Sequence, residues 1–265
     1  MGKIIGKRGL SRQTIRRRKS MADYRENQVN YQAGTQSGAV YDEGLRSYML
    51  GVYNYMALGI AATAVGILAI GSSPEIFNAV RGMYWLFFIG LIAMGWFGPN
   101  MIINSRSTAT AHAAFWIYAA LWSLAIAPTV NIYLGINPNI VFQAFAITAG
   151  MFGAMSIIGY TTKRDLSGIG QFAVMALIGL LIAALVNVFF IGSIGFSLFV
   201  SAGFVLLISA ITAWETQMIK NFYNAGDTRD IASRKSIFGA FMLYGSFISM
   251  FINILQLLGF MSGDD

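Results

Sequence analysis

Five long stretches without any Asp, Glu, Lys or Arg dominate this chain and decide what it can fold into. Their lengths are 28, 24, 56, 49 and 28 residues, and they cover residues 47–74, 82–105, 107–162, 166–214 and 236–263. A helix needs about 20 apolar residues to cross the hydrocarbon core of a bilayer. The three shorter stretches hold one spanning helix each and the two longer ones hold two each. The pattern therefore predicts an all-α membrane protein with seven transmembrane helices.

Polar and helix-breaking residues place the boundaries of these spans. The expected spans are residues 50–71, 83–104, 108–128, 140–160, 171–191, 194–214 and 237–259. Gly and Pro at 71–74 end the first span, and Asn131 and Pro138 mark residues 129–139 as a turn. We expect a basic tail at 1–46, a seven-helix transmembrane domain at 47–261 and a short tail at 262–265.

The basic residues fix an orientation once the spans are threaded. Ten of the 18 Lys and Arg residues precede the first span, and seven more fall in the loops after spans two, four and six. Only Arg81 falls on the other side. Cytoplasmic loops carry the excess of Lys and Arg in membrane proteins. The pattern predicts a cytoplasmic amino terminus and an external carboxyl terminus.

Composition agrees with a membrane domain and limits the partners. Mean hydropathy is +0.62, and charged residues make up 11% of the chain, against roughly 25% in soluble domains. The net charge of +7 therefore indicates basic loops beside an anionic leaflet rather than a nucleic-acid partner. The absence of Cys leaves no disulfide framework and no thiolate metal site.

The first twenty residues contain no acid and include the basic run 16–19. Residues 1–46 have no apolar core of the kind found in a cleavable secretory signal. Two interpretations stay open. One is a disordered basic tail, or sequence upstream of a start at Met21. The other is an Arg-rich organellar presequence.

No constellation of catalytic side chains is found in the sequence. His112 is the one histidine, no pair of carboxylates lies within a span, and no His and Glu residues have the spacing of metal ligands. A lone His in a helix is more often hydrogen-bonded to a neighbour than catalytic. We expect neither an enzyme nor a resident cofactor.

Glu215 is the most suggestive ionisable residue. It follows the apolar run 204–214, and its helix can continue through Tyr223. A charge at the centre of a bilayer costs about 2.5–3.5 kcal/mol, and far less near the boundary. One interpretation is a carboxyl group that titrates and gates a path near the inside face. The other is a solvated helix end paired with Lys220.

The seventh span carries a polar stripe made of Ser246, Ser249, Asn253 and Gln256. Their spacings of 3, 4 and 3 place them on one face of a helix. Such a stripe faces protein or water rather than lipid. It serves either hydrogen bonding between helices, worth roughly 0.6–2 kcal/mol per bond, or the lining of a polar pathway. Both interpretations predict that the seventh span is buried. Candidate partners in other spans are Asn54, Gln143 and Asn187.

Four segments resemble bacterial members of the Bax inhibitor-1 family. They are 41–56 (YDEGLRSYMLGVYNYM), 159–168 (GYTTKRDLSG), 214–220 (WETQMIK), and the last helix with its residues 243–244, 247–248 and 251. The resemblance runs from about residue 40 to residue 260 and keeps order and spacing. It implies two three-helix groups around a central seventh helix. It also implies a calcium leak regulated by pH, through one acid on helix six and one on helix seven.

This chain departs from that pattern at both acids. Glu215 stands where the family usually has Asp, and Ser246, which cannot ionise, stands at the acid of helix seven. The paired-acid switch is therefore not available in its usual form. What is left is titration of Glu215 alone, hydrogen-bonded to Ser246.

Two hypotheses of function follow. The first is a passive cation pathway, a calcium leak, with Glu215 as gate and with Ser246, Ser249, Asn253 and Gln256 lining the route. Oxygen ligands suit calcium, but four neutral ones bind it weakly, so calcium would bind only transiently near Glu215. The second is implied by the resemblance to bacterial members of the family. In it the chain is a regulator or substrate of a membrane-anchored ATP-dependent protease, which would bind the basic tail.

A third, weaker hypothesis is a cytoprotective membrane protein that acts through partners without transport. The bacterial-type motifs and the lack of Cys favour a bacterial inner membrane. The Arg-rich start keeps a mitochondrial inner membrane as the alternative. The oligomeric state is left open.

Overall fold

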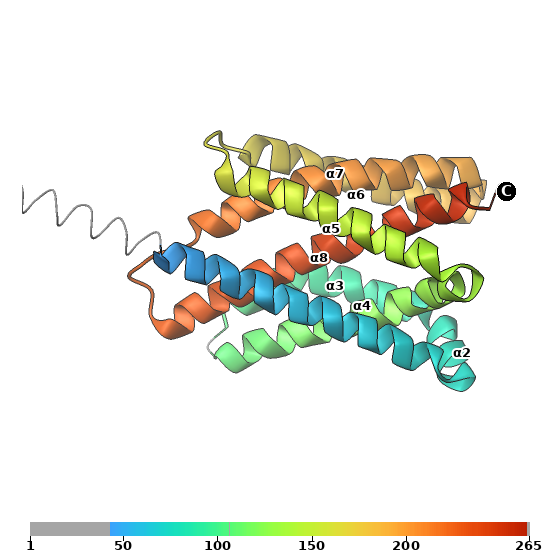
Figure 1. The fold of residues 1–265 in the computed structure, drawn as a ribbon, viewed down its shortest axis with the longest axis horizontal. Helices are drawn as coiled ribbons and strands as arrows, with labels where there is room; N and C mark the ends of the chain where they lie inside the picture. Colours follow the sequence, from blue (N-terminus) through green and yellow to red (C-terminus); the bar gives the residue numbers. More distant parts are fainter. Residues whose placement is uncertain (1–42, 106, 264–265) are drawn as a thin grey trace, which may run out of the picture. The chain divides into compact units, whose positions relative to one another are not determined.

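The computed structural model describes residues 43–105 and 107–263, in which every regular element is a helix. The chain divides after Ser47, and the arrangement given below is that of the unit that begins at Tyr48. In chain order the helices are Glu43–Gly71, α2 (Pro74–Gly82), α3 (Tyr84–Ile103), α4 (Thr108–Ile136), α5 (Pro138–Thr161), α6 (Ser167–Val186), the π-helical turn η1 (Asn187–Ile191), α7 (Ile194–Asn221) and α8 (Arg229–Met261) (Figure 1).

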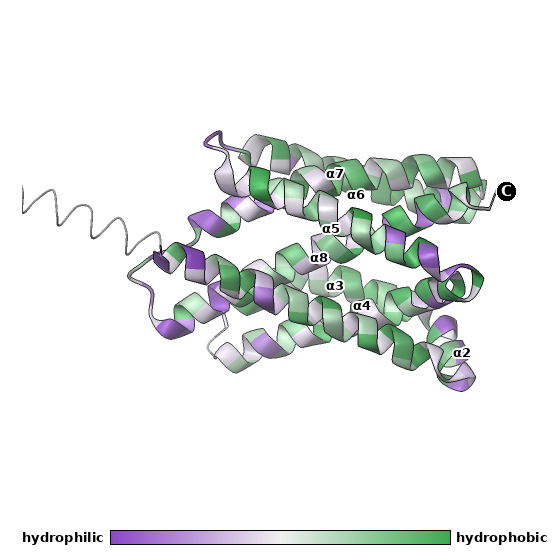
Figure 2. Cartoon of the chain, viewed as in Figure 1, coloured by the Kyte–Doolittle hydropathy of each residue, from purple (hydrophilic) through white to green (hydrophobic). Residues whose placement is uncertain are grey.

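Seven of the described helices are long and apolar enough to cross a membrane, with α6 and η1 counted as one span. Their lengths run from 20 to 33 residues and the mean hydropathy of their most apolar windows from 1.6 to 2.8. Hydrophobic residues fill the middle of the bundle, and hydrophilic residues gather mostly near its ends (Figure 2). The prediction of an all-α protein with seven spans is confirmed. The basic tail at residues 1–42 and Asp264–Asp265 lie outside the described residues.

Polar caps explain where five of these helices begin. In each case a side-chain oxygen at the N-cap accepts a hydrogen bond from a backbone N–H of the first turn, which has no partner within the helix. The five cap residues are Ser73, Ser107, Asn137, Ser193 and Thr228. The sequence predicted a break after the first span but missed α2, a short helix that follows Ser73 and starts with Pro at its first position.

The turn predicted at residues 129–139 is wrong in its extent. Helix α4 continues to Ile136, and Asn137 alone connects it to α5. Asn131, taken as a turn residue, instead donates from Nδ2 to the carbonyl oxygens of Ala127 on its own helix, at 2.9 Å, and Ile67 on the first spanning helix, at 3.0 Å. In the sequence, a polar residue that hydrogen-bonds two helices to each other cannot be distinguished from a loop residue, which is why the turn was predicted too long.

Helix α8 is the most buried of the spans. It packs against α3, α4, α5 and α7 and passes through the middle of the bundle in Figure 1. In its most apolar window 78% of residues are buried, against 6% for the span Ser167–Ile191. This confirms that the seventh span is an interior helix. The division of the other six spans into two groups of three stays a prediction.

Candidate functional site

Glu215 lies in the interior of the bundle, on α7. Only 4% of the residue is exposed, and its Oε2 accepts a hydrogen bond of 2.7 Å from Oγ of Ser246 on α8. The hydrogen bond expected from the sequence is therefore present. The alternative of a solvated helix end paired with Lys220 is wrong, because Lys220 Nζ donates instead to the carbonyl oxygen of Tyr160 on α5, at 2.7 Å.

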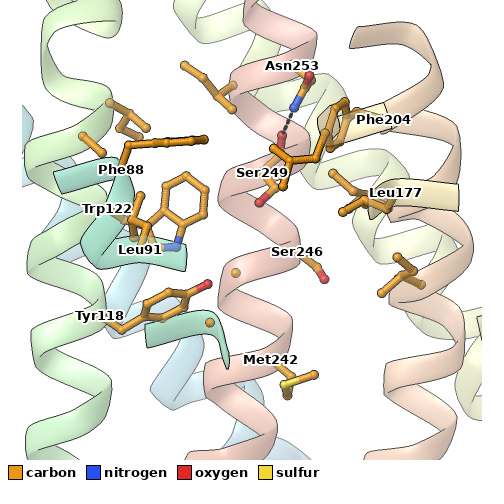
Figure 3. Close-up of a pocket in the computed structure, with 18 of the residues that line it drawn as sticks. Phe88, Leu91, Tyr118, Trp122, Leu177, Phe204, Met242, Ser246, Ser249 and Asn253 are labelled. Carbon is orange, nitrogen blue, oxygen red and sulfur yellow. Dashed lines mark hydrogen bonds between the residues drawn. The ribbon is translucent and has the colours of Figure 1, made fainter. Parts of the chain in front are cut away.

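A cavity of about 500 Å³ lies beside this pair and is lined by α3, α4, α6, α7 and α8. Figure 3 shows its walls, with α8 in the centre. All five residues singled out from the sequence line it: Glu215, Ser246, Ser249, Asn253 and Gln256. The prediction that the four polar residues share one face of α8 is thus confirmed, because all four line the same cavity.

Within the stripe the polar groups are partly satisfied by near neighbours. Asn253 donates from Nδ2 to the carbonyl oxygen of Ser249, at 2.8 Å, the bond drawn in Figure 3. Gln256 accepts from Oγ of Ser201 on α7, at 3.1 Å. Asn187, a candidate partner from the sequence, instead holds its own hairpin by hydrogen bonds to Ser193 and Ser197.

Two aromatic residues of α4 face the same cavity and were missed by the sequence reasoning. Tyr118 stacks on Phe241 of α8 with ring centroids 4.1 Å apart and lines the cavity together with Glu215. Trp122 has its Nε1 buried and without a hydrogen bond of ordinary geometry among the described residues. Their spacing of four residues puts both on one face of α4, but an aromatic pair in an apolar span gives no signal of which side it faces.

Two smaller cavities continue the space along the bundle, away from Glu215. The first, of about 250 Å³, shares Asn253 and Gln256 with the large cavity and adds Asn187 and Ser197. The second, of about 310 Å³, shares Gln256 and Ser197 with the first and reaches Ile194, at the start of α7. Polar side chains therefore line a series of adjoining spaces from Glu215 to the turn between η1 and α7.

The protein is tightly packed on the other side of Glu215. Ile219, one helical turn farther along α7, is fully buried. It lies so close to Gly239 of α8 that a Cβ atom on this glycine would be 2.9 Å from Cγ2 of Ile219. Phe222, the residue just after α7, then stacks on Phe238 of α8, with centroids 5.6 Å apart. Helices α7 and α8 thus close the space just beyond the carboxyl group.

Side chains near this closed end hold the connections between helices. Gln217 accepts from the backbone N–H of Leu166 at 2.9 Å and donates to the carbonyl oxygen of Arg164 at 2.8 Å, which fixes the loop between α5 and α6. Lys235 forms an ion pair of 2.5 Å with Asp227 and also donates to the carbonyl oxygen of Phe222. These contacts connect the start of α8 to the end of α7.

His112 has the role expected from the sequence. Its Nδ1 is hydrogen-bonded to the hydroxyl group of Tyr55 on the first spanning helix, at 2.6 Å. It does not line the large cavity. The histidine therefore joins two helices, as the more conservative interpretation predicted.

A model of the family described as inhibitor of apoptosis-promoting Bax1 matches residues 45–263. The chain belongs to the Bax inhibitor-1 family. The inner membrane protein YbhL of Escherichia coli K12 is 36% identical over 221 residues, which cover 82% of this chain and 92% of YbhL. A protein of Rickettsia prowazekii is also 36% identical, over 85% of this chain and 94% of its own length. A membrane protein of Streptococcus pyogenes is 39% identical, over 82% and 94%.

These relatives agree with the spans found in the structure. Family membership over nearly the whole helical region and seven spanning helices make the chain a multi-pass integral membrane protein. The bacterial relatives support an inner membrane as its location. The lipid bilayer is therefore its surrounding medium, which fits the many large apolar side chains on its outer surface, such as Trp96 and Phe190.

Proposed function

We propose that the chain forms a passive cation pathway, a calcium leak, and that Glu215 controls it. The observation that carries the proposal is that a buried carboxyl group and the whole polar face of α8 share one cavity. An ionisable residue inside a membrane domain is costly and marks ion or substrate pathways. Carboxylate, hydroxyl and amide oxygens are the ligands that calcium takes.

The route would run through the adjoining cavities from the turn near Ile194 to Glu215. Its oxygens come from Ser197, Ser201, Gln256, Asn253 and the other members of the stripe. Neutral oxygens bind calcium weakly, which suits transit rather than storage. The pathway needs no catalysed reaction, no cofactor and no fixed metal.

The gate would be the closed segment just beyond Glu215. For an ion to pass, α7 and α8 have to separate where Ile219 packs on Gly239, and the hydrogen bond from Ser246 to Glu215 crosses the same interface. A change in the charge of this carboxyl changes that bond. Sensitivity to pH would therefore come from one carboxyl rather than from a pair.

The distribution of basic residues supports an orientation for this route. Several basic residues lie in the connections and helix ends beyond the closed segment near Ile219: Lys163, Arg164, Arg229, Arg234 and Lys235. Cytoplasmic loops are enriched in such residues. We propose that this end, with the amino terminus, faces the cytoplasm of a bacterium, so that the cavities lie toward the outside.

Calcium flux into proteoliposomes tests the proposal. Purified protein is reconstituted and flux is measured between about pH 5 and pH 8 for the wild type, Glu215→Gln and Glu75→Gln. Glu75 is an exposed residue of α2, so Glu75→Gln makes the same chemical change away from the cavity. We expect flux that varies with pH in the wild type and in Glu75→Gln, and flux that loses this variation in Glu215→Gln.

Two other outcomes of the flux measurement would change the proposal. Flux that is insensitive to pH and to Glu215→Gln would keep the leak but remove the carboxyl from its control. Folded protein that gives no more flux than empty liposomes would refute the pathway and favour the protease hypothesis. In that case deletion of residues 2–40, outside the described part of the chain, is expected to abolish the effect on the protease.

A further inference from the structure

The large cavity has a side wall that the protein does not seal tightly. Helix α3 packs against α4 and α8, and α6 packs against α7, but α3 and α6 make at most marginal contact with each other. Both line the cavity. At one end of this seam the ring of Trp85 on α3 stacks on Phe189 of η1, with centroids 5.6 Å apart. Only 6% of the residues in the most apolar window of the span Ser167–Ile191 are buried by protein, so α6 lies at the edge of the bundle and the seam would face the hydrocarbon of the bilayer.

Aromatic rings surround the space behind the seam. Phe88 on α3 and Trp122 on α4 approach it from one side, and Phe204 on α7 from the other (Figure 3). Tyr118 lies on the same wall as Trp122. The face of an aromatic ring attracts cations, including organic ones. The passage of hydrated calcium alone does not require aromatic walls.

The inner end of the space carries an acid without a basic partner. No Lys, Arg or His among the described residues lies within ion-pair distance of Glu215, and its hydrogen-bond partner, Ser246, is neutral. A buried carboxylate favours a partner of opposite charge. The volume of about 500 Å³ is within the range of about 300–1,000 Å³ typical of sites for small organic ligands.

We propose that this cavity binds a hydrophobic organic cation that enters from the bilayer between α3 and α6. The positive centre of the ligand lies toward Glu215, and its apolar groups lie against Phe88, Trp122 and Phe204. The polar stripe of α8 forms the back of the site. The proposal concerns binding and stands whether or not the cavity conducts calcium.

Direct binding of tetraphenylphosphonium to protein in lipid nanodiscs tests this site. Tetraphenylborate, an anion of nearly the same size and shape, is the matched ligand, and empty nanodiscs correct for partition into lipid. We expect saturable binding of the cation to the wild type and much weaker binding of the anion. Glu215→Gln is expected to weaken binding of the cation at least about tenfold, because a charge-assisted contact is lost.

Three variants separate charge from damage to the fold. Glu215→Asp keeps the charge and should bind more tightly than Glu215→Gln, and Glu75→Gln should bind like the wild type. Phe204→Leu should weaken binding of the cation about threefold or more.

Equal binding of cation and anion by the wild type would overturn the proposal and indicate a cavity that takes any hydrophobic molecule, such as a lipid chain. This comparison needs no variant, so it decides the matter even if Glu215→Gln fails to fold. Unchanged binding by a folded Glu215→Gln protein would also overturn it. None of these outcomes depends on calcium flux, which is measured separately.

Discussion

Gly159 offers a sharp test of how α5 is held against α7, the helix that carries Glu215. A Cβ atom at Gly159 would lie 2.1 Å from the carbonyl oxygen of Ala213. That oxygen belongs to the backbone of α7, two residues before Glu215, so it cannot move aside as a side chain would. Gly159→Ala therefore requires α5 and α7 to separate by about 0.9 Å to reach the shortest Cβ contact of 3.0 Å.

The expected loss of stability follows from two opposing effects. Overpacking a well-packed interface costs about 1–3 kcal/mol. Replacing Gly by Ala inside a helix returns about 0.5–1 kcal/mol. Because the clash is with backbone that cannot move aside, the overpacking cost lies in the upper half of that range, at about 2–3 kcal/mol. The net loss is then about 1–2.5 kcal/mol, and at about 2–4 °C per kcal/mol for a chain of this size the melting temperature should fall by several degrees.

Gly150→Ala is the matched control on the same helix. A Cβ atom at Gly150 would meet no atom within 4 Å apart from its chain neighbours and the nearby backbone of its own helix, so this variant should be as stable as the wild type or slightly more so. Thermal unfolding of both proteins in one detergent, followed by tryptophan fluorescence, measures the difference. Equal melting temperatures for the two variants would refute the contact between Gly159 and Ala213.

Two further substitutions test other contacts. Thr63→Val should destabilise the protein by about 1–3 kcal/mol, because the fully buried hydroxyl group of Tyr244 loses its hydrogen-bond partner at 2.7 Å. Thr161 is exposed, so Thr161→Val is the control and should have little effect in the same thermal assay. Hydrogen bonds from Ser167 hold the pKa of Asp165, in the loop before α6, below its ordinary value. This stabilisation is present above about pH 4 and is lost as pH falls through the lowered pKa. At neutral pH, Asp165→Asn should therefore be less stable to heat than the wild type. A difference of the same size at low pH would contradict the assignment.

The spans and the face of α8 that carries the stripe were accessible from the sequence for one physical reason, whereas the pairing of Glu215 with Ser246 came from the resemblance to the Bax inhibitor-1 family. In a membrane domain most positions are apolar, so the few polar ones carry most of the information. Four polar residues at helical spacing on α8 have to avoid lipid. An acid within two turns of a helix end has to find a partner or water.

The walls of the cavity were not accessible in this way. Phe88, Phe204 and Trp122 face the cavity, while Trp96 and Phe190 face outward, and all five lie in predominantly apolar stretches of their spans. Lipid and an apolar cavity favour the same side chains, so periodicity cannot separate them. Only the packing of α3, α4 and α7 against α8, and of α6 against α7, shows which aromatic residues share the site.

The end of α4 shows the converse difficulty. Polar residues near a span end are typical of turns, and Asn131 was assigned to one for that reason. Its amide instead bonds to carbonyl groups on two helices. A sequence shows that such a residue needs a partner, but it does not show whether that partner is water or a neighbouring helix.

The central claim is that the polar face of α8 borders an aqueous space. The chain contains no Cys, so a single introduced cysteine is the one thiol that a reagent can modify. Ser249→Cys and Asn253→Cys report on the polar face. Ile248→Cys, next to Ser249, reports on a neighbouring cavity without polar lining. Each protein in sealed vesicles is treated with a charged, membrane-impermeant methanethiosulfonate, added from one side and then from the other.

We predict modification of Ser249→Cys and Asn253→Cys from the outer side and protection of Ile248→Cys from both sides. Protection of all three cysteines, or equal modification of Ile248→Cys, would contradict an aqueous path along α8.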